Sequence, residues 1–150
     1  MIIEKIKSFD GEFAFLSNFY PSEFIDKGIS FPTVEHYFQA MKSDSAFDCL
    51  KIAAAASPGQ AKRLGRHCLL RKDWESVKDS IMEQGLRLKF EDPELRQKLI
   101  DTHPAELVEG NLWHDNTWGD CSCEKCRYTP GENRLGKLLM KLRTEFMEEN

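Results

Sequence analysis

The chain has 150 residues, of which 41% are hydrophobic and 31% are charged, and its formal net charge is −4. This length predicts one domain, residues 1–150, with a single core, and the composition excludes a disordered chain. The excess of acidic over basic residues disfavours strong non-specific binding to DNA, because such binding depends on neutralising many phosphates.

The apolar segments are too short for a membrane protein, since none approaches the roughly 18 residues that suggest a membrane-spanning helix. The opening residues, MIIEKIKSFDGEF, place acids and lysines where a secretion signal needs an apolar run. We therefore expect a cytoplasmic monomer without a membrane partner.

The first third of the chain is predicted to consist of strands and turns. IIEKIKSF, residues 2–9, alternates well enough for a strand, and the aromatic segment after it is broken by Pro21. Asp26, Lys27 and Gly28 stand between two short apolar runs and predict a hairpin turn. These signals predict a small N-terminal β-sheet.

Helix signals dominate the next part of the chain. Thr33 is expected to cap a helix that begins at Val34. A second helix is expected over residues 46–55. SPGQ, residues 57–60, combines a Ser cap, Pro at the first helical position and Gln where a capping box requires it, so it predicts a third helix.

Three further helices and a short strand are predicted in the second half of the chain. Asp73 can cap a helix over residues 74–90, and Asp92-Pro93-Glu94 starts another that ends near residues 102–104. AELVEG, residues 105–110, is expected to contain a short strand. The last helix carries a buried stripe that comprises Leu135, Leu138, Leu139, Leu142 and Phe146.

Together these elements predict a single compact, helix-rich α+β domain. Residues 111–132 are the exception, because they read as a loop of 22 residues. A loop of this length without structure of its own is usually functional.

Two stripes of side chains run along the predicted helix that follows Thr33. The first has the spacing of a core-facing stripe and comprises Val34, Tyr37, Phe38 and Met41. The second lies beside it, at the edge of the buried surface, and comprises Glu35, Gln39 and Lys42. This polar stripe is either a solvated edge or the floor of a cleft.

Glu35 occupies the first turn of this helix, where free backbone N–H groups and the helix dipole favour an ionised carboxylate. Such a group suits a base, a nucleophile or a stabiliser of positive charge. Asp120, in the long loop, either ends a turn or supplies the second carboxylate that glycosidic hydrolysis uses.

The same loop is rich in aromatic and polar side chains. Trp118 either fills the core or stacks on a flat ligand, since aromatic rings are good platforms for bases. Asn133 is a candidate helix cap or a donor to a sugar hydroxyl. KRLGRHCLLRK, residues 62–72, holds five Lys or Arg and no acid, so it is either a solvated helix face or a phosphate-binding patch.

Three of the five cysteines, Cys121, Cys123 and Cys126, crowd into CSCEKC. In a cytosolic chain such spacing indicates metal or redox chemistry before disulfides. A structural zinc needs a fourth ligand, for which His114, Cys49 and Cys68 are candidates. We expect a reduced loop without a metal or other cofactor, with structural zinc as the alternative.

Seven segments occur in the order found in the NADAR superfamily, whose bacterial members include the YbiA-like N-glycosidases. The resemblance spans nearly the whole chain, and it rests on FLSNFYPSEF, FPTVEHYFQAMK, SPGQAKRLGR, RKDWESVK, LRLKF, LVEG with DNTWGD, and NRLGKLLMKLR. It implies a single, mainly helical α+β domain and a hydrolase that acts on N-glycosyl bonds. One departure is CSCEKCRYTP, which stands where YbiA-like sequences tend to be glycine-rich.

The resemblance also implies the site. The family's essential Glu falls on Glu35, and its Trp-Gly-Asp motif falls on residues 118–120. With Asp120 as the second catalytic group, the expected substrate-binding residues are Asn18, Phe19, Gln39, Lys42, Lys62, Arg63, Arg66, Trp74, Trp118, Gly119 and Asn133. Glu35 would stabilise a ribosyl cation or form a covalent intermediate, and Asp120 would serve as base or acid.

The family leaves the substrate open. We expect removal of ADP-ribose from ADP-ribosylated guanine, borne by DNA or a nucleotide, because the chain reads as a lone domain without a fused pathway enzyme. The alternatives are cleavage of ribosylaminopyrimidine phosphates, which are early riboflavin intermediates, and a non-catalytic ADP-ribose-binding module. A zinc-dependent interaction module would instead centre on CSCEKC.

Overall fold

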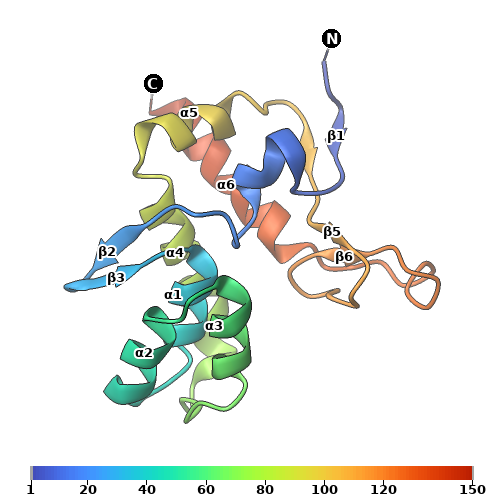
Figure 1. Ribbon diagram of the computed structural model, residues 1–150. Helices are drawn as coiled ribbons and strands as arrows, with labels where there is room; N and C mark the ends of the chain where they lie inside the picture. Colours follow the sequence, from blue (N-terminus) through green and yellow to red (C-terminus); the bar gives the residue numbers. More distant parts are fainter. Residues whose placement is uncertain (1, 150) are drawn as a thin grey trace. The chain divides into compact units, whose positions relative to one another are not determined.

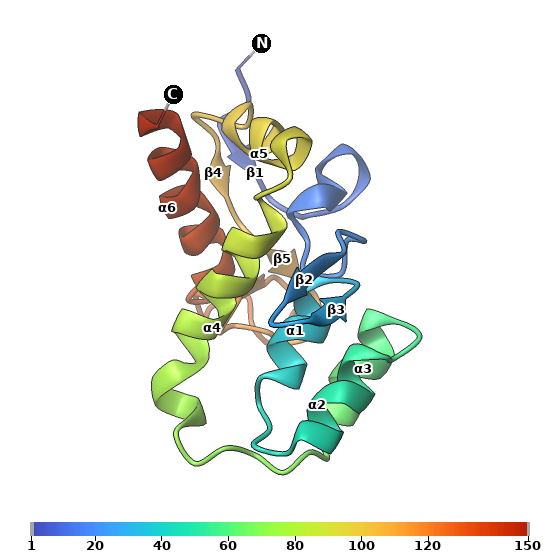
Figure 2. The same cartoon turned by 90° about the vertical axis from the view of Figure 1, so that its left-hand side faces the viewer.

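The computed structural model describes residues 2–149, so the ends of the predicted domain, Met1 and Asn150, lie outside the described residues. The chain has a mixed α and β architecture in which helices predominate (Figures 1 and 2). It divides into two compact units: unit 1 combines the chain up to Ser17 with the chain from Pro93 onward, and unit 2 is Asn18–Asp92. Whether the two behave as the one domain expected from the sequence stays a prediction.

Unit 2 begins with an antiparallel hairpin, β2 (Phe24–Asp26) and β3 (Ile29–Phe31), which leads into helix α1 (Val34–Ala40). The turn between the strands holds Lys27 and Gly28 at positive φ, as a tight hairpin requires. The expected N-terminal β-sheet is therefore this hairpin. Its aromatic rings pack on α1, with the ring centres of Phe31 and Tyr37 5.1 Å apart.

Three more helices complete unit 2: α2 (Ala46–Ala53), α3 (Pro58–Gly65) and α4 (Trp74–Lys89). All three contact α1, which becomes the central element of the unit (Figure 1). Every residue of α1 is buried, including Glu35 at 7% exposure and Gln39 at 4%. The interpretation of the polar stripe as a solvated edge is therefore wrong, because α3 covers the face that periodicity placed at the border.

The helix starts in unit 2 follow the sequence signals with one exception. The Thr33 side chain accepts a hydrogen bond from the backbone N–H of His36, and Ser57 does the same for Gln60. Asp73 precedes α4 but makes no capping bond. Its carboxylate accepts two hydrogen bonds from the Arg71 guanidinium instead, and these lower the pKa of Asp73. The predicted Asp73 cap is thus wrong, since a charged partner outcompetes the backbone amides.

Unit 1 contains helices α5 (Pro93–Ile100) and α6 (Arg134–Glu148), which pack together, and a 3₁₀ helix over Gly11–Leu16. Its core includes three leucines of α6 and Phe146, in agreement with the predicted stripe, although Leu138 is only half-buried. Arg143 lies among them and donates hydrogen bonds to Thr102 Oγ1 and the Ala105 carbonyl.

The strands of unit 1 form two short parallel pairs, one between distant segments and one within the last third of the chain. β1 (Lys5–Ile6) pairs in parallel with β4 (Glu106–Leu107), and β5 (Gly110–Asn111) pairs in parallel with β6 (Asp120–Cys121). The predicted strand over residues 2–9 is therefore shorter than expected, and its partner is the AELVEG segment. β6 also interrupts the region that the sequence presented as one structureless loop. Within residues 2–149, no helix is long and apolar enough to cross a membrane.

Candidate functional site

The candidate site in unit 2 is built on α1, whose start is fixed by His36. This imidazole lies 2.8 Å from Thr33 Oγ1 through Nδ1 and 3.0 Å from the Ala55 carbonyl through Nε2. With both ring nitrogens engaged and 1% exposure, His36 has a structural role. It joins α1 to the segment between α2 and α3.

Glu35 and Gln39 lie one helical turn apart on α1, and both are buried. Gln39 Nε2 donates a 2.8 Å hydrogen bond to Glu35 Oε1. Gln39 Oε1, in contrast, is buried without a hydrogen-bond partner. A Cβ at Gly65 of α3 would collide with this amide, so only glycine lets α3 approach Gln39 so closely.

Asn18 joins the same cluster. Its carbonyl accepts a 3.1 Å hydrogen bond from the backbone N–H of Glu35, and its side-chain Nδ2 lies 3.3 Å from Met82 Sδ. Asn18 Oδ1 is buried without a partner, as Gln39 Oε1 is. Unsatisfied buried polar atoms are rare in proteins, and these two oxygens can accept hydrogen bonds from water or from a polar ligand.

Lys42 lies just beyond the end of α1 and faces this cluster. Its Nζ is 5.9 Å from the ring centres of both Phe38 and Trp74, and these two rings are themselves 5.0 Å apart. Burial lowers the pKa of Lys42, and the negative charge of Glu35 opposes this shift. The positive charges of Lys62 and Arg66 lower the pKa further, which places both near Lys42.

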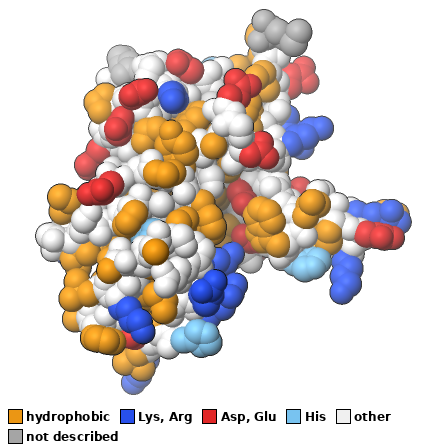
Figure 3. All heavy atoms as spheres, in the orientation of Figure 1, with side chains coloured by type: hydrophobic (Ala, Val, Ile, Leu, Met, Phe, Trp, Pro, Cys, Tyr) orange, Lys and Arg blue, Asp and Glu red, His pale blue; other side chains and the backbone are white. Residues whose placement is uncertain are grey.

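The structure thus brings together seven of the expected site residues: Asn18, Glu35, Gln39, Lys42, Lys62, Arg66 and Trp74. Arg63 is exposed on α3, and Phe19 is 44% exposed. Trp74 is only 7% exposed, and its ring lies beside Lys42 Nζ. In Figure 3, Lys and Arg side chains gather in the region where Figure 1 places α3.

The other expected residues belong to unit 1, around β6. The Asp120 backbone N–H donates to the Glu109 carbonyl, and Asp120 Oδ1 accepts a 2.9 Å hydrogen bond from the N–H of Gly131. A Cβ at Gly119 would collide with Glu109. Trp118 is half-buried. Because Glu35 and Asp120 lie in different units, their pairing at one site stays a prediction.

Asn133 precedes α6 in the left-handed conformation, at φ 49, and makes no capping bond. Its Oδ1 accepts from the N–H of Glu109 at 3.0 Å, and its Nδ2 donates to the Leu107 carbonyl at 2.9 Å. The interpretation of Asn133 as a helix cap is therefore wrong. Its amide fastens the start of α6 to the end of β4 and to Glu109, which lies between β4 and β5.

The region between β5 and β6 also uses residues that sequence reasoning did not single out. Asn111 Oδ1 accepts from the N–H groups of Trp113 and Asp115, and Asp115 Oδ1 accepts from those of Thr117 and Trp118. The sequence signal for these hydrogen bonds is the large number of Asn and Asp residues between β5 and β6, because their side chains often bond to nearby backbone N–H groups in turns. These bonds set the position of Trp118.

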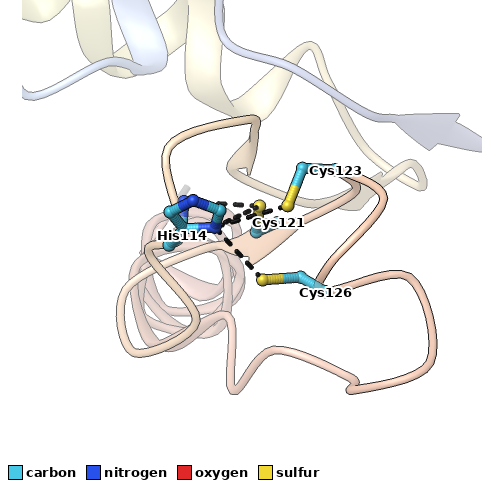
Figure 4. A group of neighbouring side chains, drawn as sticks. All are labelled: His114, Cys121, Cys123 and Cys126. Carbon is cyan, nitrogen blue, oxygen red and sulfur yellow. Dashed lines mark hydrogen bonds between the residues drawn. The ribbon is translucent and has the colours of Figure 1, made fainter.

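A cluster of four potential metal ligands lies in the same part of unit 1: His114, Cys121, Cys123 and Cys126 (Figure 4). One ligand atom from each residue falls within 4.8 Å of all the others. Cys49 and Cys68, the other candidate ligands, pack instead against the hydrophobic cluster of unit 2. Desolvation raises the pKa of Cys126 to about 11, with further contributions from the neighbouring thiols Cys123 and Cys121.

Comparison with known proteins places this architecture in a family. The NADAR domain model matches residues 6–147. A protein named N-glycosidase YbiA from Shigella flexneri is 44% identical over 136 residues, which cover 89% of this chain and 81% of that protein. The solution structure of the Escherichia coli protein YbiA covers 99% of this chain and 86% of that one, with 40% identity and a TM-score of 0.82.

A more distant relative is a larger protein, and only part of it matches this chain. The riboflavin biosynthesis protein PYRR of Zea mays, a chloroplastic protein, is 39% identical over 131 residues, which are 79% of this chain but 20% of that protein. The helix-rich α+β fold and the match over nearly the whole length define the class of protein. The chain belongs to the NADAR domain family.

Proposed function

We propose that this protein hydrolyses the N-ribosyl bond of an ADP-ribosylated guanine, carried by DNA or by a nucleotide, and so reverses a toxin's modification. Activity as a hydrolase of N-glycosyl bonds is supported by membership of the NADAR family and by the N-glycosidase YbiA relatives. The choice of leaving base and the binding of phosphates are argued from the residues of unit 2.

The observation that carries the proposal is the buried carboxylate of Glu35, held by Gln39 and faced by Lys42. Cleavage of the bond between ribose C1 and the exocyclic amine places positive charge on the ribose. A carboxylate fixed in a water-poor site stabilises that charge or forms a transient covalent bond to C1. Water then adds to C1, and the departing amine gains a proton.

The surrounding residues fit the rest of the substrate. Lys62 and Arg66 supply positive charge beside Lys42, which suits a diphosphate. The unsatisfied oxygens of Asn18 and Gln39 suit donors such as ribose hydroxyls or the amino edge of a base. We assign Asp120 of unit 1 to the activation of water or to proton transfer. Trp118 of the same unit is assigned to stacking on the base.

A second candidate substrate is favoured by a specific observation. Relatives from Zea mays and Arabidopsis thaliana are named riboflavin biosynthesis proteins. The same site would then cleave a ribosylaminopyrimidine phosphate, with one phosphate rather than two beside Lys62 and Arg66. Both substrates share the N-ribosyl bond, so the role of Glu35 is the same in each.

The deciding experiment incubates the protein with an ADP-ribosylated guanine oligonucleotide and, separately, with the phosphorylated ribosylaminopyrimidine, and identifies the products by mass spectrometry. We expect free ADP-ribose from the first substrate. Release of ribose 5-phosphate from the second alone would favour the riboflavin alternative. Tight binding without either product would contradict both and leave an ADP-ribose-binding module.

The Glu35→Gln variant tests the mechanism in the same assay. It keeps an acceptor for the Gln39 amide but loses the charge, so we expect turnover to fall by about 10³-fold or more while substrate binding persists. Glu91→Gln is the matched control, because it removes an exposed carboxylate of the same unit. Activity of Glu35→Gln close to that of the control would rule out the mechanism.

A further inference from the structure

The four-residue cluster in unit 1 has the geometry of a coordination shell. His114 Nδ1 lies 3.3 Å from Cys123 Sγ, 3.4 Å from Cys126 Sγ and 4.0 Å from Cys121 Sγ (Figure 4). In a tetrahedral zinc site with ordinary bond lengths, neighbouring nitrogen and sulfur ligands are about 3.6 Å apart and two sulfurs about 3.8 Å apart. The nitrogen–sulfur distances of 3.3–4.0 Å bracket the value for a zinc site, and all four ligand atoms lie within 4.8 Å of one another, so small side-chain shifts bring the cluster to tetrahedral geometry.

The backbone is arranged to bring these side chains together. His114 adopts φ 70, a left-handed conformation that is unfavourable for a residue with a Cβ. Its N–H donates to Cys121 Sγ at 3.3 Å. The N–H of Cys126 donates to the Cys123 carbonyl at 3.1 Å and closes the Cys-x-x-Cys turn. The Asn116 side chain accepts from the N–H of Cys121 at 2.8 Å and fixes the third thiol.

The segment that carries the cluster has little hydrophobic core of its own. Leu112 is 67% exposed, Trp113 61% and Tyr128 83%. Small segments that cannot bury enough apolar surface are commonly held by a metal or by disulfides. All three cysteines of the cluster are free thiols, so a disulfide does not take that role.

We propose that His114, Cys121, Cys123 and Cys126 bind one Zn²⁺ ion. Three thiolates and one imidazole form one of the standard ligand sets of structural zinc, and four protein ligands leave no open position for a substrate or water. Binding releases the thiol protons. The resulting site carries a net charge of −1, and the exposed side chains of Lys125 and Arg127 flank it.

The role of the ion follows from where its ligands lie. Cys121 directly follows Asp120 on β6, while His114 follows β5 and Cys126 belongs to the outer part of the loop. Zinc would therefore tie both parallel strands to the loop and hold the backbone that carries Trp118 and Asp120. This structural role is independent of the reaction that the protein catalyses.

The first test measures zinc in the purified, reduced protein by plasma mass spectrometry after expression with added zinc. We expect one zinc per chain in the wild type and nearly none in Cys123→Ser or His114→Ala. Cys49→Ser is the matched control, because it removes a half-buried thiol outside the cluster, and it should retain one zinc. A wild-type content well below one zinc per chain would overturn the proposal, as would equal loss in the control.

A second test does not depend on the folding of any variant. Zinc is removed from the wild-type protein with a chelator and replaced by Co²⁺. We expect the intense visible bands of tetrahedral cobalt together with near-ultraviolet thiolate-to-metal charge transfer, and both should disappear when zinc is added back. Weak octahedral bands would contradict the proposal. Removal of the metal should also speed tryptic cleavage after Lys125 and Arg127, and unchanged cleavage would argue against the structural role.

Discussion

At the scale of single residues, burial gives two side chains of unit 2 unusual properties. Glu35 is a carboxylate that α1 and α3 enclose, and such burial is costly unless hydrogen bonds and opposite charge compensate it. Gln39 and Lys42 supply both. Lys89, at the end of α4, is 2% exposed, and its Nζ lies 5.2 Å from the ring centre of Phe90 and 5.7 Å from that of Tyr20.

The buried Lys89 predicts a pH-dependent stability. Desolvation lowers its pKa from 10.5 to about 7 in the folded protein. Between these values the unfolded chain binds the proton and the folded protein does not, so the free energy of unfolding should rise with pH. We expect an increase of a few kcal/mol, measured by urea denaturation at pH values from about 7 to 10.

The contribution of Lys89 is isolated by comparison of variants. Lys89→Met should remove this rise over the same pH range, while Lys137→Met, which changes an exposed lysine of α6, should keep it. A Lys89→Met variant with the wild-type slope would show that Lys89 stays charged in the folded protein.

At the scale of elements, the contact between α3 and α1 controls the position of Gln39. A Cβ at Gly65 would lie 2.9 Å from Gln39 Cδ and 3.2 Å from Gln39 Cβ. We expect Gly65→Ala to displace the amide from Glu35, to lower the free energy of unfolding by about 1–3 kcal/mol and to reduce kcat/KM at least about tenfold. Thermal unfolding and steady-state kinetics measure the two effects.

Gly59, which also lies in α3, offers the control for Gly65→Ala. A Cβ at Gly59 would meet only Ser57 Oγ, at 3.9 Å. Gly59→Ala should therefore leave activity unchanged and stabilise the protein by up to about 1 kcal/mol through helix propensity. If Gly65→Ala behaved like Gly59→Ala, the close approach of α3 would have no part in holding Gln39.

At the scale of the whole molecule, the proposed chemistry draws residues from both compact units. Trp118 of unit 1 tests this directly. If Trp118 stacks on the substrate base, Trp118→Ala should weaken binding by about 1–3 kcal/mol and slow turnover. Trp113→Ala is the control, because that side chain is 61% exposed in the same segment. A KM and kcat equal to those of the control would confine the substrate site to unit 2.

Local signals explain most of what was predicted correctly. Thr33 and Ser57 cap their helices, the hairpin turns at Lys27 and Gly28, and the α6 stripe is largely buried. Each of these depends on residues within a turn or two along the chain. The family, too, could be identified from motifs in order. The predictions at Asp73 and Asn133 were wrong because each side chain has several possible hydrogen-bond partners. Which partner it binds depends on their positions in the folded chain, and the spacing of residues in the sequence does not give these positions.

Local patterns and motifs were enough to predict where helices begin, which of their faces are apolar, the family and Glu35 as the expected catalytic group. The three-dimensional structure was needed to show that Glu35 and Gln39 are buried, that Lys62 and Arg66 lie near Lys42 and that His114 meets three thiols. It also decided the parallel pairing of β1 with β4 and of β5 with β6. Some of these contacts join segments far apart along the chain, such as β1 and β4, and others close a loop whose path local patterns do not specify, such as β5 with β6. In both cases the packing of the folded chain as a whole selects the contact.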